Sequence, residues 1–422
     1  MLFIYGGAYI YGYNGDPVYD ATYTSIKGDV VVVSMNYRVA SLGFLAGVKD
    51  KKTGEEINGN YGLLDQILAM KWVKDHIGMF GGAPDKITLY GQSAGAASIA
   101  IHLTGPQSVK ELFNHAIMES SPLGLPYRTI EEAKHVAKEF ARNLGCEVED
   151  LACMRSKSAK EVVEAQNLKD RVLQAALHGI ADFLIWAPVI DGKIVSAHPL
   201  TKIARNKIDK SLIIGTNKNE GLTFVAFSMN RLDMKHLNDI EYSLALDVIF
   251  RNNELKNEVL EQYPHQDGNN EKMLGKVLTD YLFTCPSLFL ADNSSMKTWV
   301  YLFDHISSFN GLKLIGLNIC GDAVCHGTEL PFVFHTANHI GFDFTEEERL
   351  LSGLIVNYWA NFAKNVDPNG NGPQWSEYKS RTSNVILVTP IDEIESKKDL
   401  KAKCDFWDKV GYDLHTSFWD IF

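Results

Sequence analysis

The chain alternates between short apolar runs and longer stretches in which apolar residues recur every three or four positions. The apolar runs are typical of buried β-strands. Val30-Val31-Val32-Val33 is apolar at every position, as expected where a parallel sheet is covered on both faces. Seven runs predict strands: Met1–Tyr5, Val30–Met35, Lys86–Tyr90, His115–Met118, Ser211–Gly215, Trp299–Asp304 and Asn384–Val388.

Helical periodicity fills the intervals between the strands. In the helix predicted over Leu63–Met79, five apolar side chains fall near one face: Leu64, Ile67, Leu68, Trp72 and Ile77. Further helices are predicted over Ala94–His102, Ile130–Asn143, Glu254–Tyr263 and Arg349–Ala363. The alternation of strands and helices predicts an α/β fold. Because no repeat and no linker rich in Pro, Gly or Ser divides the chain, we expect one domain over residues 1–422.

Composition excludes several classes of function. The chain has 422 residues, of which 41 are basic and 52 acidic, so its formal net charge is −11. An acidic chain without a basic cluster is a poor partner for nucleic acid or an anionic membrane. No apolar run approaches the roughly 18 residues that a membrane-spanning segment needs. We therefore expect neither a nucleic-acid partner nor an integral membrane segment.

The six cysteines leave two interpretations open. They are Cys146, Cys153, Cys285, Cys320, Cys325 and Cys404. An even number with two close pairs is compatible with three disulfides in an oxidising compartment. Six buried free thiols fit the count equally well.

A candidate nucleophile lies in Gly91-Gln92-Ser93-Ala94-Gly95, a Gly-x-Ser-x-Gly pattern. The pattern follows the predicted strand Lys86–Tyr90 and precedes an alanine-rich helix, which is the setting of a nucleophile elbow. The sharp turn exposes the serine hydroxyl, the small neighbours avoid clashes, and free N–H groups of the helix point toward the same place. A glycine-rich turn with an incidental serine is the alternative.

Gly6-Gly7-Ala8, directly after the first strand, is a candidate oxyanion hole. Acyl transfer builds negative charge on a carbonyl oxygen, and small residues let backbone donors approach that oxygen closely. We assign the donors to the N–H groups of Gly7, Ala8 and Ala94. An ordinary glycine turn is the alternative.

The candidate acid and base come from two later loops. Glu220 lies just after the strand Ser211–Gly215, at the end of a strand where α/β folds place their chemistry. His326 stands in a polar turn before the apolar segment Leu330–Phe332. The order Ser93, Glu220, His326 is the order of an α/β-hydrolase triad, although a lone loop glutamate or histidine is more often structural.

These segments together resemble the type-B carboxylesterase/cholinesterase family of α/β-hydrolases. The resemblance extends to Asn36-Tyr37-Arg38, Gly59–Gln66, Phe80-Gly81-Gly82, Pro188–Gly192, Tyr358–Ala363 and Asp367-Pro368-Asn369. It implies a mostly parallel central sheet flanked by helices. It also implies a serine esterase without metal or cofactor that acts on small-molecule carboxylic esters and belongs to the secretory pathway.

The resemblance assigns roles to individual residues. Ser93 is the implied nucleophile, His326 the general base and then acid, and Glu220 the residue that orients His326. Glu329 and Ser121 match positions that support the triad from behind. Cys146–Cys153 and Cys285–Cys404 match family disulfides, and we expect Cys320 to pair with Cys325.

Three features depart from the family pattern. Gln92 replaces the acidic residue that usually precedes the nucleophile, which removes a negative charge beside the site. Asp182 and Leu184 occupy the positions of the acyl pocket instead of an aromatic clamp, so we do not expect a choline specialist. Met1–Tyr5 begins inside the predicted sheet without a signal sequence, so we expect an N-terminally truncated chain that lacks the first strands.

We therefore predict a serine carboxylic-ester hydrolase that forms an acyl-enzyme. A non-catalytic cholinesterase-like adhesion protein, an inactive truncated fragment and a lipase are the alternatives.

Overall fold

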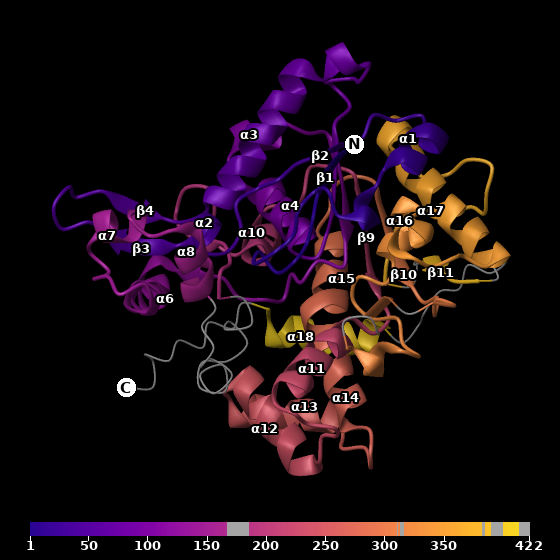
Figure 1. Ribbon diagram of the computed structural model, residues 1–422. Coiled ribbons are helices and arrows are strands. Elements are labelled where there is room, and N and C mark those ends of the chain that lie inside the picture. Colours follow the sequence, from indigo (N-terminus) through magenta and orange to yellow (C-terminus); the bar gives the residue numbers. More distant parts are fainter. Residues whose placement is uncertain (167–184, 310, 313–315, 382–384, 390–399, 413–422) are drawn as a thin grey trace.

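The computed structural model describes residues 1–166, 185–309, 311–312, 316–381, 385–389 and 400–412 (Figure 1). Its centre is a seven-stranded sheet in the order β11-β10-β9-β6-β5-β1-β2, and every pairing in this sheet is parallel. The strands are β1 (Leu2–Ile4), β2 (Val33–Ser34), β5 (Thr88–Gln92), β6 (His115–Glu119), β9 (Leu212–Asn217), β10 (Thr298–Phe303) and β11 (Val385–Leu387). Each strand falls within or overlaps one of the seven predicted runs, which confirms the α/β prediction.

Two small sheets lie outside the central one. β3 (Ala46–Lys49) pairs antiparallel with β4 (Glu56–Asn58), and β7 (Arg128–Thr129) pairs parallel with β8 (Val189–Ile190). These strands are two to four residues long and carry little apolar pattern. Periodicity therefore did not predict them.

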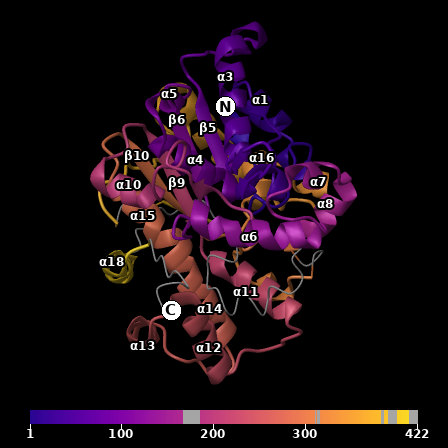
Figure 2. The same ribbon diagram turned by 90° about the vertical axis from the view of Figure 1, so that its left-hand side faces the viewer.

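Helices flank the central sheet on both sides. α3 (Tyr61–His76), α4 (Ala94–Thr104) and α10 (Pro199–Arg205) lie on one side, whereas α1 (Thr22–Gly28), α16 (Leu330–Phe334) and α17 (Glu346–Asn365) lie on the other (Figure 1). The other helices are α2 (Ala40–Phe44), α5 (Gln107–Lys110), α6 (Ile130–Asn143), α7 (Leu151–Arg155), α8 (Ala159–Gln166), α11 (Glu220–Arg231), α12 (Asp239–Phe250), α13 (Asn253–Gln262), α14 (Asn270–Leu278), α15 (Cys285–Asp292) and α18 (Leu400–Val410). α12, α13 and α14 gather at the lower end of the molecule in both views (Figure 2).

The predicted buried face of α3 was confirmed for Ile67 and Ile77, which are 6% and 5% exposed, and was wrong for its other three residues. Leu64, Leu68 and Trp72 are 41%, 67% and 46% exposed, whereas Leu63 and Met70 are fully buried. The helix carries two apolar stripes about 100° apart, and only one of them can face the sheet. None of the helices in the described residues is both long and apolar enough to cross a membrane.

Three disulfides link segments of the described chain. Cys146 pairs with Cys153, Cys285 with Cys404, and Cys320 with Cys325. These are the three pairings that we expected. The second bridge joins α15 to α18 and therefore fastens the C-terminal helix beside the sheet.

Candidate active site

Ser93 lies in a sharp turn between β5 and α4. Its backbone is in a rare conformation for a residue with a side chain, with φ of 56° and ψ of −123°. The turn can pack closely against β1 because two neighbours of Ser93 are glycines. A Cβ on Gly91 would come within 2.6 Å of the carbonyl oxygen of Ile4, and one on Gly95 would overlap that oxygen. The turn is further held by the N–H of Ser93, which donates to the carbonyl of Glu119 over 2.9 Å.

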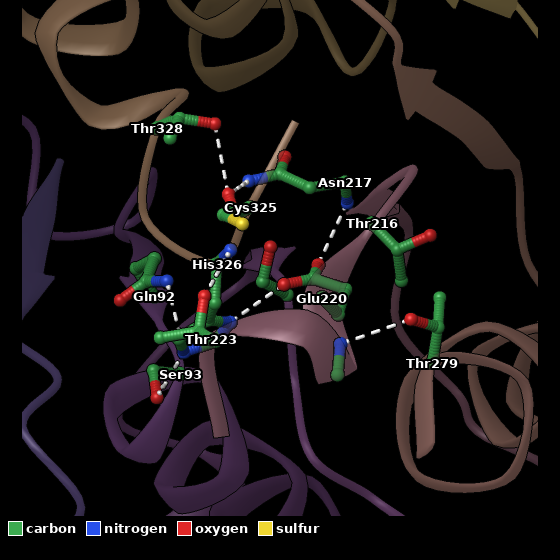
Figure 3. Close-up of polar contacts among 12 residues, drawn as sticks. Gln92, Ser93, Thr216, Asn217, Glu220, Thr223, Thr279, Cys325, His326 and Thr328 are labelled. Atoms are coloured by element: carbon green, nitrogen blue, oxygen red, sulfur yellow. Dashed lines mark hydrogen bonds and ion pairs between the residues drawn. The ribbon is translucent and has the colours of Figure 1, made fainter. Parts of the chain in front are cut away.

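Ser93, His326 and Glu220 form one hydrogen-bonded chain (Figure 3). The Oγ of Ser93 lies 2.8 Å from Nε2 of His326, and Nδ1 of His326 lies 2.6 Å from Oε2 of Glu220. Glu220 is fully buried as the first residue of α11, and its other oxygen accepts the N–H of Asn217 over 2.7 Å. The sequence thus brings together three side chains from distant segments at the carboxyl end of the sheet.

The turns that carry Glu220 and His326 are tied directly to each other. Asn219 exchanges two hydrogen bonds with Val324: its N–H donates to the carbonyl of Val324 over 2.9 Å, and its side-chain oxygen accepts the N–H of Val324 over 3.1 Å. The backbone N–H of His326 donates to Oγ1 of Thr223 over 3.0 Å. The Cys320–Cys325 disulfide closes the loop just before His326. These contacts fix the position of the imidazole relative to Glu220.

Two opposing effects act on the pKa of His326. Burial lowers it, but the charge of Glu220 and the hydrogen bond to Glu220 raise it by more. The net pKa therefore lies above the ordinary value of 6.5. The Glu220 carboxylate thus favours the protonated imidazole, as a general base requires while it holds a proton.

The loop after β1 lies against the serine turn. A Cβ on Gly6 would lie 2.9 Å from Cβ of Ser93, so only glycine leaves room for this approach. Gly7, Ala8 and Tyr9 follow with φ of 109°, 54° and 60°. Such conformations are costly for residues other than glycine, and the surrounding structure must hold them. Ala94, the third predicted donor, is the first residue of α4, where N–H groups lack partners within the helix.

Gln92 reaches the same imidazole nitrogen as Ser93. Its side-chain Nε2 lies 3.4 Å from Nε2 of His326. Gln92 therefore places a neutral amide next to the histidine, where a carboxylate would carry a charge.

Glu329 lies behind the Ser93–His326–Glu220 chain. One of its oxygens accepts from Oγ of Ser120 over 3.3 Å, and the other accepts from the side chain of Asn217. Our prediction of Ser121 at this place was displaced by one residue, because it is the hydroxyl of Ser120 that bonds Glu329. The hydroxyl of Ser121 is buried and has no hydrogen-bond partner in the described part of the chain.

Two aromatic residues beside His326 were not predicted from the sequence. The rings of Phe224 and Phe283 lie 5.3 and 5.2 Å from the imidazole, between centroids. Phe224 belongs to α11, and Phe283 belongs to the π-helical turn Thr279–Thr284. Since only the fold brings them together, the sequence carries no local signal for them. The predicted acyl-pocket residues Asp182 and Leu184 lie outside the described residues.

Comparisons with known proteins show the family of the chain. A model of the carboxylesterase family matches residues 1–407. The chain is 34% identical over 428 residues to the cAMP-regulated D2 protein of Dictyostelium discoideum, covering 98% of this chain and 75% of that protein. It is 34% identical over 434 residues to the Crystal protein of the same organism, covering 99% and 74%. It is also 34% identical over 435 residues to the cholinesterase of Mus musculus, covering 96% and 68%. With its serine turn, parallel sheet and end-to-end match, this chain belongs to the carboxylesterase family.

Proposed function

We propose that this protein is a serine hydrolase of small carboxylic esters, with Ser93, His326 and Glu220 as its catalytic triad. The observation that carries the proposal is the continuous chain of short contacts from Ser93 Oγ to Glu220 Oε2 through one imidazole. A hydroxyl is a weak nucleophile until an adjacent base removes its proton, and this arrangement supplies the base and orients it.

In the acylation step, Ser93 Oγ attacks the ester carbonyl while its proton passes to Nε2 of His326. The resulting imidazolium is stabilised by Glu220 at 2.6 Å. The N–H groups of Gly7, Ala8 and Ala94 then hold the negative oxygen of the tetrahedral intermediate. Losing one such donor typically costs about 3 kcal/mol of transition-state stabilisation. His326 returns its proton to the alcohol as it leaves.

Deacylation repeats these steps with water as the nucleophile. His326 takes a proton from water, which attacks the acyl-enzyme, and Ser93 leaves with that proton when the acid is released. Phe224 and Phe283 flank the imidazole on its apolar side. They limit the water around the histidine and so strengthen its interaction with Glu220.

Covalent labelling tests the proposal. A fluorescent organophosphonate should label the protein, and a digest should find the probe on Ser93. The Ser93→Ala variant should take up no label. A folded protein that resists the probe would favour a binding or adhesion protein, and a label on another residue would overturn the assignment of Ser93. Two Dictyostelium relatives, named D2 protein and Crystal protein, bear names that state no reaction, so this alternative is a real outcome of the test.

The substrate class needs a separate measurement. Hydrolysis of nitrophenyl esters should be fastest for short acyl chains in solution. Activity that rises on long acyl chains at an oil–water interface would identify a lipase instead. We also propose that the protein works in an oxidising compartment, since its three disulfides require one to persist.

A further inference from the structure

Three buried carboxyl groups gather behind His326. Glu220 and Glu119 are fully buried, and Glu329 is 1% exposed. Glu119 is the last residue of β6, directly before Ser120, whose hydroxyl donates to Glu329. The three groups therefore lie along one path that runs from the imidazole into the core of the sheet.

These carboxyl groups cannot all be ionised together. Within the described residues, the side-chain donors that reach them are His326, Asn217, Ser120 and Trp359, and only His326 among these can carry a positive charge. Burying a carboxylate away from water is costly, and a second one nearby adds repulsion. Burial and the charge of Glu220 raise the pKa of Glu329 to about 7. Burial and the charge of Glu329 raise the pKa of Glu119 to about 8, against the lowering effect of the Trp359 hydrogen bond.

The hydrogen bonds favour Glu119 as the group that holds a proton. Glu220 and Glu329 each accept at both oxygens. Glu119 accepts at one oxygen only, from Nε1 of Trp359 over 2.6 Å. Its other oxygen is buried and has no partner among the described residues, and an unpartnered oxygen is far less costly on a neutral acid than on a carboxylate.

The groups that face Glu119 from other strands are neutral too. The hydroxyls of Tyr90 on β5 and Tyr301 on β10 are buried, and neither has a partner in the described part of the chain. The pKa of each tyrosine lies well above its ordinary range, chiefly through burial and then through the charge of Glu119. Neither hydroxyl supplies a charge that would stabilise the carboxylate of Glu119.

We propose that Glu119 is a positioning residue that keeps a proton behind the triad, so that only Glu220 and Glu329 set the field at His326. An ionised Glu119 would add a further negative charge behind the imidazole and would favour its protonated form. Because that form cannot accept the proton of Ser93, the neutral acid keeps His326 available as a base. This inference rests on the proposed esterase function for its consequence, but the proton itself can be observed without a substrate.

Infrared difference spectroscopy tests the proton directly. The natural protein at pH 7 should show carbonyl absorption of neutral carboxylic acids. The component that disappears as the pH is raised past about 8 should be missing from the Glu119→Gln variant, which keeps only the component that Glu329 loses near pH 7. Trp359→Phe should shift the loss of the Glu119 component to higher pH, because the indole hydrogen bond lowers the pKa of Glu119. A Glu119 component unchanged in Glu119→Gln, or lost at lower pH in Trp359→Phe, would overturn the proposal, whether or not the protein hydrolyses esters.

Kinetic measurements test how Glu119 and Glu329 affect the pKa of His326. The acid limb of the kcat/KM profile reports the pKa of His326. Glu329→Gln should move that limb to lower pH, because the charge of Glu329 raises the pKa of His326. Glu119→Gln should leave the limb where it is, since one neutral group replaces another. An equal downward movement in both variants would mean that Glu119 is ionised, and the proposal would be wrong. If no variant or natural protein hydrolyses an ester, the proposed function fails while the infrared result still decides the state of Glu119.

Discussion

Nδ1 of His326 lies 2.6 Å from Oε2 of Glu220, although 106 residues separate the two in the chain. The hydrogen bonds between Asn219 and Val324 hold the two turns together and make this distance a property of the scaffold. Because His326 is held against the buried carboxylate of Glu220, its pKa is raised, and the proposed hydrolysis should depend on pH accordingly.

We predict that kcat/KM falls as the pH is lowered through a value above 6.5. The general base must be unprotonated, and Glu220 raises the pKa of His326, so activity is full above that pKa and is lost below it. Glu220→Gln should shift this limb to lower pH and reduce kcat by roughly 10⁴-fold, because an amide neither stabilises the imidazolium nor fixes the tautomer. Initial rates on a neutral nitrophenyl ester measure both effects. The pH should run from about 5 to about 9, because the ordinary pKa of histidine, about 6.5, lies within this range. An acid limb that stays in place in the variant would show that Glu220 does not act on His326.

Removing either reacting side chain should abolish hydrolysis. Ser93→Ala and His326→Ala should each lower kcat by roughly 10⁶-fold, since members of a triad act as a unit. Far-UV circular dichroism should stay unchanged in both variants. Ser108→Ala, at an exposed serine outside the site, is the matched control and should keep the natural rate. Turnover that survives in the Ser93 variant would disprove the assignment of the nucleophile.

The amide of Gln92 should limit the rate on positively charged esters. Gln92→Glu places a carboxylate near Nε2 of His326, which now lies 3.4 Å from the amide nitrogen. The negative charge should attract a cationic substrate and raise its kcat/KM relative to a neutral ester of the same size. The ratio of the two rates is the measurement, because it cancels differences in folding. A ratio that stays constant or falls would mean that other groups set the field at the substrate.

The contact between Gly6 and Ser93 should be essential for the oxyanion hole. A methyl group at Gly6 would come within 2.9 Å of Cβ of Ser93 and would push the loop away. Since a displacement of about 1 Å can cost 10²-fold in rate, Gly6→Ala should lower kcat by about that factor. Gly78→Ala is the control, because nothing lies within 4 Å of the added methyl group. Equal rates in the two variants would argue against donors from this loop.

The long-range disulfide should contribute more stability than the short one. In the chain-entropy account, a bridge across 119 residues contributes about 5 kcal/mol and one across 7 residues about 2 kcal/mol. Replacing Cys285 and Cys404 together by serine should therefore lower the free energy of unfolding more than replacing Cys146 and Cys153. Urea unfolding of the two double variants gives the comparison. The opposite order would mean that strain or residual structure outweighs loop closure.

Much of the fold could be predicted because the signals are local. Each strand of the central sheet overlaps a predicted run of mainly apolar residues, and β5 and α4 frame a serine between small residues. The buried face of α3 could be predicted only in part, because Leu63 and Leu64 begin two equally apolar stripes and the sheet selects one.

The contacts in the site that join side chains from distant segments could not be predicted from local sequence patterns either. Phe224 and Phe283 meet His326 from two different helices. Ser120 replaces Ser121 beside Glu329 because the chain turns there with φ of 51° at Ser120, and a shift of one residue reverses the direction of a side chain.

Gly95 packs directly against the backbone of Ile4, so the residues around Ser93 differ in how well they tolerate substitution. Ser93, His326 and Glu220, the proposed triad, can each be exchanged for a smaller or isosteric group that fits the same space. Any side chain at Gly95 would instead collide with the backbone of β1 and force α4 off the sheet. In a randomised library, dead but folded variants should therefore cluster at the reactive positions, whereas at Gly95 loss of activity should coincide with loss of soluble protein.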